Sequence, residues 1–282
     1  MSSTPRGVAL GRALRQLRRE RGMSLRELGE RIDRDFPTLS RWESGERVPK
    51  PQHVAQILAL LGVEGDGFRR VMRLGEDLDQ TCWVASAGAE LGIQRDAYLA
   101  VSATAVHVTE VASRVVPPLL RTRQVATVMA RAGEVPADQV DAHLAGLFAR
   151  QRAVLHQEST SLTVLVGADA LGRSMGRTES QVAQLERLLR LAEHPRIDLR
   201  VTPADGSPDF SQPFTVTRTP HATLAVLHLR GSTVWLHRPE DLDRLTEDVE
   251  FLRANASSPA DSVAEITEVL RAHGTADLVQ AG

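Results

Sequence analysis

The sequence predicts a protein of two parts, an all-α head followed by a larger α+β domain. Apolar residues recur at helical spacing from position 1 to position 62, whereas residues 161–166 form a β-branched run and residues 197–201 alternate with period 2. The length of 282 residues suits about two domains. With 42% hydrophobic and 25% charged residues, the composition is that of a globular protein and not of a disordered chain or a fibre.

Five short helices are expected in the head, each with recognisable end signals. The first stops at Gly22, where a C-cap glycine belongs. The second begins at Ser24, and Glu27 three residues later completes a capping box. Pro37 lies in the first turn of the third helix, which ends at Gly45. The fourth and fifth helices are expected around residues 51–61 and 64–78.

The rest of the chain mixes helical and strand patterns. Small and mixed residues over 79–99 predict a linker or joining helix, and the run 103–113 can be helical. Further helices are predicted at 137–157 and 179–192 and in two acidic stretches at the end, with strands at 161–166, 197–201, 214–217, 224–229 and 234–236. The expected boundaries are 5–78 for the head, 79–100 for the linker or joining helix and 101–275 for the α+β domain.

Charge is divided unevenly between the two parts. Residues 1–62 hold 12 Lys and Arg against 7 Asp and Glu, a net +5, whereas the rest of the chain holds 22 against 29, a net −7. A basic head on an acidic body suggests that the head meets a polyanion such as double-stranded DNA. The alternative is that the six arginines between Met1 and Gly22 are only the solvated face of one helix.

The most informative stretch is residues 24–49, SLRELGERIDRDFPTLSRWESGERVP. Two short helices joined by a tight turn form a helix-turn-helix, whose second helix can enter a major groove about 12 Å wide. Leu28, Leu39 and Trp42 are expected to hold the helices together, and Gly29 to permit a close approach. The run from Ser40 to Gly45, SRWESG, closely resembles the recognition-helix end of the Xre and phage-repressor type of helix-turn-helix. The fold class is therefore an all-α helix-turn-helix head followed by a larger α+β domain.

This resemblance implies which side chains meet the bases. The positions that match base-reading residues of the family, with two neighbours alongside, are Phe36, Pro37, Thr38, Ser40 and Arg41. Arg41 is the strongest candidate because a guanidinium pairs bidentately with guanine. Phe36 and Pro37 depart from the polar residues common at these positions, and they either contact a thymine methyl group or only pack the turn.

Other residues near the helix ends suit the phosphate backbone. Ser24 lies at a helix N-terminus, Arg26 and Arg47 lie near helix ends, and Arg34 in the turn completes the predicted DNA-binding set. Glu43 is expected to hold the geometry between helix and loop through backbone or arginine contacts rather than to touch DNA.

The body resembles the large domain of uncharacterised function behind many actinobacterial Xre-type regulators. The similarity extends over most of the chain beyond the head and includes Val116–Thr122, VPPLLRT, where Pro118 and Arg121 depart from the usual Pro-Gly-Leu-Leu-Gln-Thr. Some of these regulators are likened to antitoxins, so the resemblance implies a small protein encoded by a neighbouring gene as one partner. A small-molecule effector is the other expectation.

No catalytic or metal-binding set is visible. The nine histidines lack a His-Glu-x-x-His motif. His221, His228 and His237 converge only if their strands are neighbours, and the alternative is that they are half-exposed strand residues. Cys82 is expected to be a small hydrophobe rather than a nucleophile, and a single cysteine fits a reducing compartment. We therefore expect no enzyme activity, cofactor or metal.

The sequence thus predicts a cytoplasmic transcription regulator that binds DNA as a homodimer. No apolar run approaches the roughly 18 residues of a membrane helix, so no membrane contact is expected. The acidic body is expected to sense a ligand or bind a partner. Two alternatives stay open: an enzyme or small-molecule receptor that the head brings to DNA, or a passive dimerisation domain.

Overall fold

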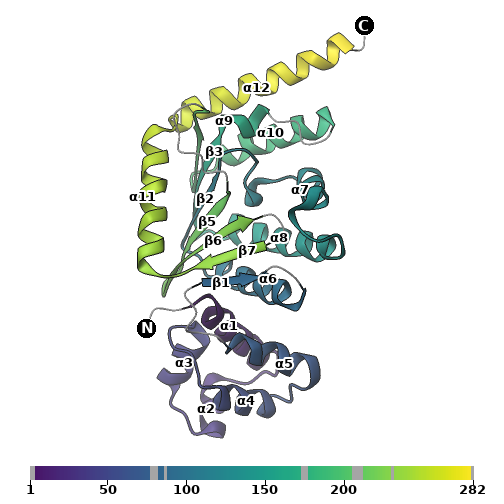
Figure 1. Ribbon diagram of the computed structural model, residues 1–282. Helices are drawn as coiled ribbons and strands as arrows, with labels where there is room; N and C mark the ends of the chain where they lie inside the picture. Colours follow the sequence, from purple (N-terminus) through teal and green to yellow (C-terminus); the bar gives the residue numbers. More distant parts are fainter. Residues whose placement is uncertain are drawn as a thin grey trace.

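The computed structural model describes residues 4–76, 82–85, 88–172, 177–204, 212–229 and 232–280. Figure 1 shows the helical head at one end of the molecule and the sheet with its covering helices beyond it. The head consists of α1 (Pro5–Glu20), α2 (Leu25–Ile32), α3 (Phe36–Ser44), α4 (Pro51–Leu60) and α5 (Gly65–Leu74). All five predicted helices of the head are confirmed, and the last is shorter at both ends than expected.

A single seven-stranded mixed sheet forms the centre of the body. Its strands are β1 (Cys82–Ala85), β2 (His107–Ala112), β3 (Ser161–Gly167), β4 (Ile197–Thr202), β5 (Phe214–Arg218), β6 (Thr223–Leu229) and β7 (Ser232–Leu236). They lie in the order β1-β7-β6-β5-β2-β3-β4. Strands β2, β3 and β4 are parallel neighbours, and the other pairs are antiparallel.

Helices cover both faces of this sheet (Figure 1). They are α6 (Gly88–Ser102), α7 (Arg123–Met129), α8 (Val140–Leu155), α9 (Ala168–Gly172), α10 (Thr178–Ala192), α11 (Pro239–Asn255) and α12 (Pro259–Gln280). Two 3-10 turns (Pro118–Leu120 and Ala137–Gln139) and a π-helical turn (Ala130–Glu134) lie in the crossover between β2 and β3. Within the described residues, no helix has both the length and the apolar character needed to cross a bilayer.

Alternation along β3 explains how one strand serves two layers. Leu162, Val164 and Val166 pack with residues of α8, α10 and α12, whereas Leu165 packs on the opposite face with Leu252 of α11. The strands predicted at 161–166, 197–201, 214–217, 224–229 and 234–236 are confirmed as β3, β4, β5, β6 and β7.

Two predictions for the middle of the chain need correction. The run 103–113 is not a helix, because His107–Ala112 forms β2, whose β-branched residues lie between β3 and β5. Of the expected linker or joining helix, Gly88–Ser102 is helical, but Cys82–Ala85 forms an edge strand paired with β7. Four residues are too few for periodicity to show, so this strand is stabilised by long-range pairing rather than by a local pattern.

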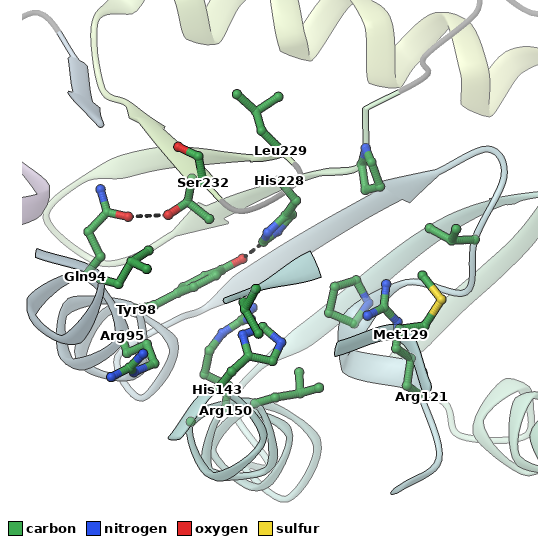
Figure 2. A pocket seen from close by; sticks show the side chains of 18 of the residues that line it. Gln94, Arg95, Tyr98, Arg121, Met129, His143, Arg150, His228, Leu229 and Ser232 are labelled. Carbon is green, nitrogen blue, oxygen red and sulfur yellow. Dashed lines mark hydrogen bonds between the residues drawn. The ribbon is translucent and has the colours of Figure 1, made fainter. Parts of the chain in front are cut away.

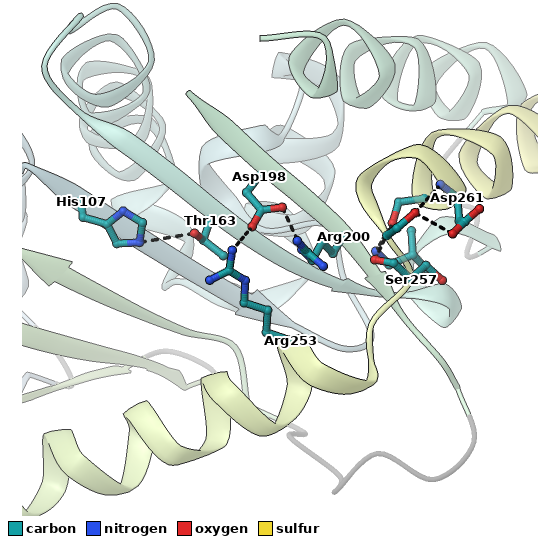
Figure 3. Close-up of polar contacts among 10 residues, drawn as sticks. His107, Thr163, Asp198, Arg200, Arg253, Ser257 and Asp261 are labelled. Carbon is teal, nitrogen blue, oxygen red and sulfur yellow. Dashed lines mark hydrogen bonds and ion pairs between the residues drawn. The ribbon is translucent and has the colours of Figure 1, made fainter. Parts of the chain in front are cut away.

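A polar row on the α11 face ties the end of the chain to the sheet (Figure 3). Arg253 of α11 donates a 2.9 Å hydrogen bond to Asp198 of β4, and Arg200 donates to the same carboxylate at 2.8 Å. The Ser262 hydroxyl accepts the Val201 N–H at 2.9 Å. These contacts cover the β4 edge of the sheet with the junction of α11 and α12.

Candidate functional site

The α2–α3 unit has the geometry of a helix-turn-helix. The capping box is confirmed, since the Ser24 hydroxyl accepts the Glu27 N–H at 3.1 Å and the Glu27 carboxylate accepts the Ser24 N–H at 2.7 Å. Asp33 takes a left-handed conformation (φ 53°), which turns the chain toward α3. A Cβ on Gly29 would lie 2.5 Å from the Arg34 carbonyl oxygen, so only glycine allows this close turn. Leu28, Leu39 and Trp42 are buried between the helices, as predicted.

A buried ion pair holds the recognition helix on α1. The Arg18 Nε and Nη2 atoms donate to the two Glu43 carboxylate oxygens at 2.6 and 2.7 Å, and the Arg18 Nη1 atom donates to the Met23 carbonyl at 2.7 Å. Both side chains are less than a tenth exposed. The hydrogen bonds that Arg18 donates to Glu43 raise the pKa of Arg18. The expectation that Glu43 holds the local geometry is therefore confirmed.

Most of the predicted DNA-binding residues lie on the surface of this unit. Those that are exposed are Ser24, Arg26, Phe36, Pro37, Ser40, Arg41 and Arg47, and Arg34 and Thr38 are half-buried. The Thr38 hydroxyl donates to Asp35, the N-cap of α3, at 2.9 Å. Arg41 lies 3.7 Å from Glu46 in an exposed pair, so its guanidinium can exchange that partner for another anion.

The exposure of Phe36 distinguishes between the two interpretations of its role. Its side chain is 59% exposed, so it does not merely pack the turn. Arg26, Arg34 and Phe36 instead line one shallow depression over the turn, together with the acidic residues Glu30, Asp33 and Asp35. The structure thus brings two cationic side chains and an exposed aromatic ring to the same edge of α3.

A second candidate site is a pocket of about 640 Å³ in the body. Figure 2 shows Arg95 and Tyr98 from α6 and His143 and Arg150 from α8 around it, with His228 on the sheet side. The wall also includes apolar side chains, among them Leu91, Val115, Met129, Val135, Leu147 and Trp235. Pockets of about 300–1,000 Å³ hold small organic ligands.

The polar residues of the pocket form a connected group. His228 Nε2 lies 3.3 Å from the Tyr98 hydroxyl and 3.1 Å from the Thr215 hydroxyl. The Arg150 guanidinium carbon lies 3.2 Å from the centre of the Tyr98 ring, and Nη2 lies 3.8 Å from the Glu110 carboxylate. Glu110 also accepts the Leu119 N–H at 2.9 Å.

Burial and positive charge set the protonation states of this group. Burial, with added repulsion from Arg150, Arg121 and His143, lowers the pKa of His228 to about 3. Burial raises the pKa of Tyr98 to about 12. Burial also raises the pKa of Glu110, although Arg150 and the Leu119 N–H oppose that shift. His228 and Tyr98 are therefore uncharged hydrogen-bonding groups at neutral pH.

The segment singled out in the sequence, Val116–Thr122, is one wall of the pocket. Arg121 is buried and donates from Nε to the Val116 carbonyl at 2.8 Å. Gln151 donates to the Pro118 and Arg121 carbonyls, and Gln184 donates to the Leu120 carbonyl at 2.9 Å. Buried amide side chains from α8 and α10 thus donate hydrogen bonds to the backbone carbonyls of a segment that has little secondary structure of its own.

The sequence indicated His228 as a candidate site residue but did not indicate the residues that surround it. His228 lines the pocket, whereas His221 is exposed in the turn before β6, and His237, which follows β7, is not part of the pocket wall. No group of three metal-binding side chains is present among the described residues. Tyr98, Arg95 and Arg150 come from helices without any motif, and only the sheet order brings them to His228.

Comparison with known protein families agrees with both parts of this architecture. Residues 9–71 match a family model described as a helix-turn-helix domain, and none of the curated proteins compared with the chain matches it. The fold and the exposed α3 define a protein of the DNA-binding regulator class. Residues 95–268 match the family described as "Domain of unknown function (DUF5753)", and the chain belongs to that family.

Glu43→Gln is expected to destabilise the protein by about 3–5 kcal/mol, because it leaves the Arg18 charge buried without its counterion. Glu46→Gln is the matched control, and its exposed pair contributes less than about 1 kcal/mol. Urea unfolding followed by circular dichroism measures both. Equal, small effects of the two substitutions would show that the Arg18–Glu43 pair does not stabilise the head.

The depressed pKa of His228 predicts a loss of stability in acid. Between about pH 6.5 and 3, the unfolded chain binds a proton at this residue and the folded chain does not. The free energy of unfolding should therefore fall as pH decreases through this range, by at most about 1.4 kcal/mol per pH unit. His228→Gln should flatten this slope relative to His221→Gln, which changes an exposed histidine. Identical slopes in the two variants would contradict the prediction.

Proposed function

We propose that this protein is a sequence-specific transcription regulator of the Xre type that binds double-stranded DNA as a homodimer. The observation that carries the proposal is the exposed α3, held rigidly by the Arg18–Glu43 pair with its polar face uncovered. The resemblance of Ser40–Gly45 to the Xre pattern supports the assignment to that type. In this proposal α3 enters the major groove.

The side chains of the head divide into two roles. Arg41 and Ser40 face the base edges, and the exposed Phe36 ring, with Pro37, contacts a thymine methyl group. Arg26, Arg34 and Arg47 neutralise phosphates around the groove. The Ser24 N–H already donates to the Glu27 carboxylate. A phosphate at this position therefore accepts a hydrogen bond from the Ser24 hydroxyl instead.

The body receives the regulatory signal in this proposal. Its pocket lies against α6, and the opposite side of α6 contacts the head through ion pairs from Arg6 to Glu90 and from Arg70 to Asp96. Arg12 also donates to the Ala100 carbonyl at 3.3 Å. The pocket and the DNA-binding head contact opposite sides of the same helix, α6. This arrangement supports a small-molecule effector over a passive dimerisation role.

We also propose that the body is a receptor and not an enzyme. The pocket offers an uncharged His228 and an uncharged Tyr98, and the hydroxyl 3.1 Å from His228 Nε2, that of Thr215, is buried and does not line the pocket, so a ligand does not reach it. Sustained turnover of any pocket ligand that is lost in His228→Gln would overturn this part of the proposal.

Arg41→Ala should weaken binding to a specific site by about 1–3 kcal/mol and relax preference at one base pair. Arg26→Ala, which changes a more exposed side chain on α2, should weaken specific and non-specific binding alike and reduce the salt slope by about 1. Fluorescence anisotropy with a duplex selected in vitro by the full chain measures both. An Arg41→Ala variant with unchanged sequence preference would remove Arg41 from the base-reading role.

A homodimer should protect an inverted repeat, with half-site centres about one helical turn or a small multiple of it apart. One short α3 reads only a few base pairs, so two heads are needed for a specific site. Light scattering of the purified chain and nuclease footprinting on the selected duplex test this. A monomer that protects one asymmetric site would contradict the dimer.

A further inference from the structure

We propose that the pocket of the body binds a small amphipathic organic acid, an anionic group joined to an apolar body. This inference rests on the proposed receptor function and specifies its ligand. The head would then respond to the concentration of an apolar acid. Two properties of the pocket wall support the proposal, its apolar surface and its arrangement of arginines.

The apolar part of the wall is contributed by several separate elements. Leu91 comes from α6, Leu147 from α8, Trp235 from β7, and Met129 from the end of α7. The volume of about 640 Å³ is within the range of pockets that enclose most of a small organic ligand. Filling this space with hydrocarbon removes apolar surface from water, which favours binding by about 25 cal/mol per Å² of surface buried.

Four arginines from different parts of the fold face the same space. They are Arg95 of α6, Arg114 after β2, Arg121 after the 3-10 turn and Arg150 of α8. Among the described residues that line the pocket, no side chain is acidic. Guanidinium groups bind carboxylates and phosphates through paired hydrogen bonds. This arrangement favours a ligand that brings negative charge to the pocket.

The surroundings of three of these arginines, Arg95, Arg114 and Arg150, leave room for an anion. Arg150 is buried, yet its nearest carboxylate oxygen, from Glu110, lies at 3.8 Å, beyond hydrogen-bond distance. Its other contacts are the Ser102 hydroxyl at 3.3 Å and the Tyr98 ring. Arg95 donates to the neutral Gln139 amide oxygen at 3.0 Å. Arg114 is exposed, where it can reach an anionic group at the rim.

The charged and neutral groups of the pocket wall together determine which ligand charge binds best. A cationic ligand would add a third charge near Arg150 and Arg95, whereas an anionic ligand offsets charge that burial makes unfavourable. Tyr98 and His228 add uncharged hydrogen-bonding atoms beside the arginines. Affinity should therefore follow the order carboxylate, then alcohol, then amine for ligands with the same hydrocarbon chain.

The π-helical turn Ala130–Glu134 lies beside this pocket, and we expect the ligand to enter the pocket there. Ala132 lies in that turn, is exposed and also lines the pocket. π-Helical turns break regular helix geometry and occur often at functional sites. A large side chain at position 132 would fill the pocket mouth without replacing a core residue.

The test uses the full chain and three ten-carbon probes: decanoate, decanol and decylamine. Isothermal titration calorimetry and tryptophan fluorescence measure binding, since Trp235 lies in the wall. We expect decanoate to bind at least about tenfold more tightly than decanol, a difference of about 1.4 kcal/mol, and decylamine to bind weakest.

Variants locate the site and the charge effect. The double variant Arg95→Gln/Arg114→Gln should reduce decanoate affinity toward that of decanol and leave decanol binding unchanged. Arg152→Gln, an exposed arginine of α8 outside the pocket wall, should leave both unchanged. Ala132→Trp should weaken all three probes. Circular dichroism confirms that each variant is folded.

The outcomes separate the ligand class from the receptor function. Equal affinity for decanoate and decanol, both blocked by Ala132→Trp, would overturn the anionic class and retain a receptor for apolar ligands. Absence of binding by all three probes would overturn the anionic ligand class. The receptor function itself fails if, in addition, Ala132→Trp leaves DNA binding unchanged in the presence of an extract of the native cell's small molecules.

Discussion

Helix α6 is the element on which the relation between the two parts of the molecule depends. Glu90 accepts hydrogen bonds from Arg6 of the head and from the Trp83 ring of the edge strand. A few residues along, Gln94 contacts Thr233 of β7, and Tyr98 contacts His228 of β6. Buried apolar residues continue this contact, because one hydrophobic cluster contains residues of α1, α3 and α4 together with Ile93, Tyr98 and Trp235. The head is therefore packed against the body.

This packing also limits what can happen in the pocket. Protein interiors are close-packed, so a ligand that moves Tyr98 or Arg95 must move α6 or deform its contacts with β6 and β7. Gln94 donates to the Trp83 carbonyl at 3.1 Å, so the edge strand shares the same constraint. Polar groups with specific partners resist gradual displacement, because each broken hydrogen bond leaves a buried atom unsatisfied. These contacts therefore resist small displacements of α6.

The head could be predicted from its sequence because its structure is determined locally. Caps such as Ser24 and Gly45 act within one turn, and the SRWESG run is contiguous. The body could be predicted only in part. Strand β2 was mistaken for a helix because all of its residues except His107 are buried, so that period-2 alternation is absent. Arg150 and Tyr98 meet because α8 packs directly on α6, a contact between distant segments that no local pattern encodes.

The proposed ligand and the proposed DNA contact are linked by thermodynamics as well as by structure. If an acid in the pocket changes the affinity for the operator, operator binding must change the affinity for the acid by the same factor. The factor is limited by how differently the DNA-bound and DNA-free states of the protein fit the ligand. A dimer amplifies it, because a small rotation of each head about α6 alters the separation of two recognition helices that must enter successive turns of the same groove. The net −7 of residues 63–282 disfavours contact between the pocket domain and phosphates, whereas the net +5 of residues 1–62 attracts the head to them, so in this proposal the ligand and the DNA act on opposite sides of α6.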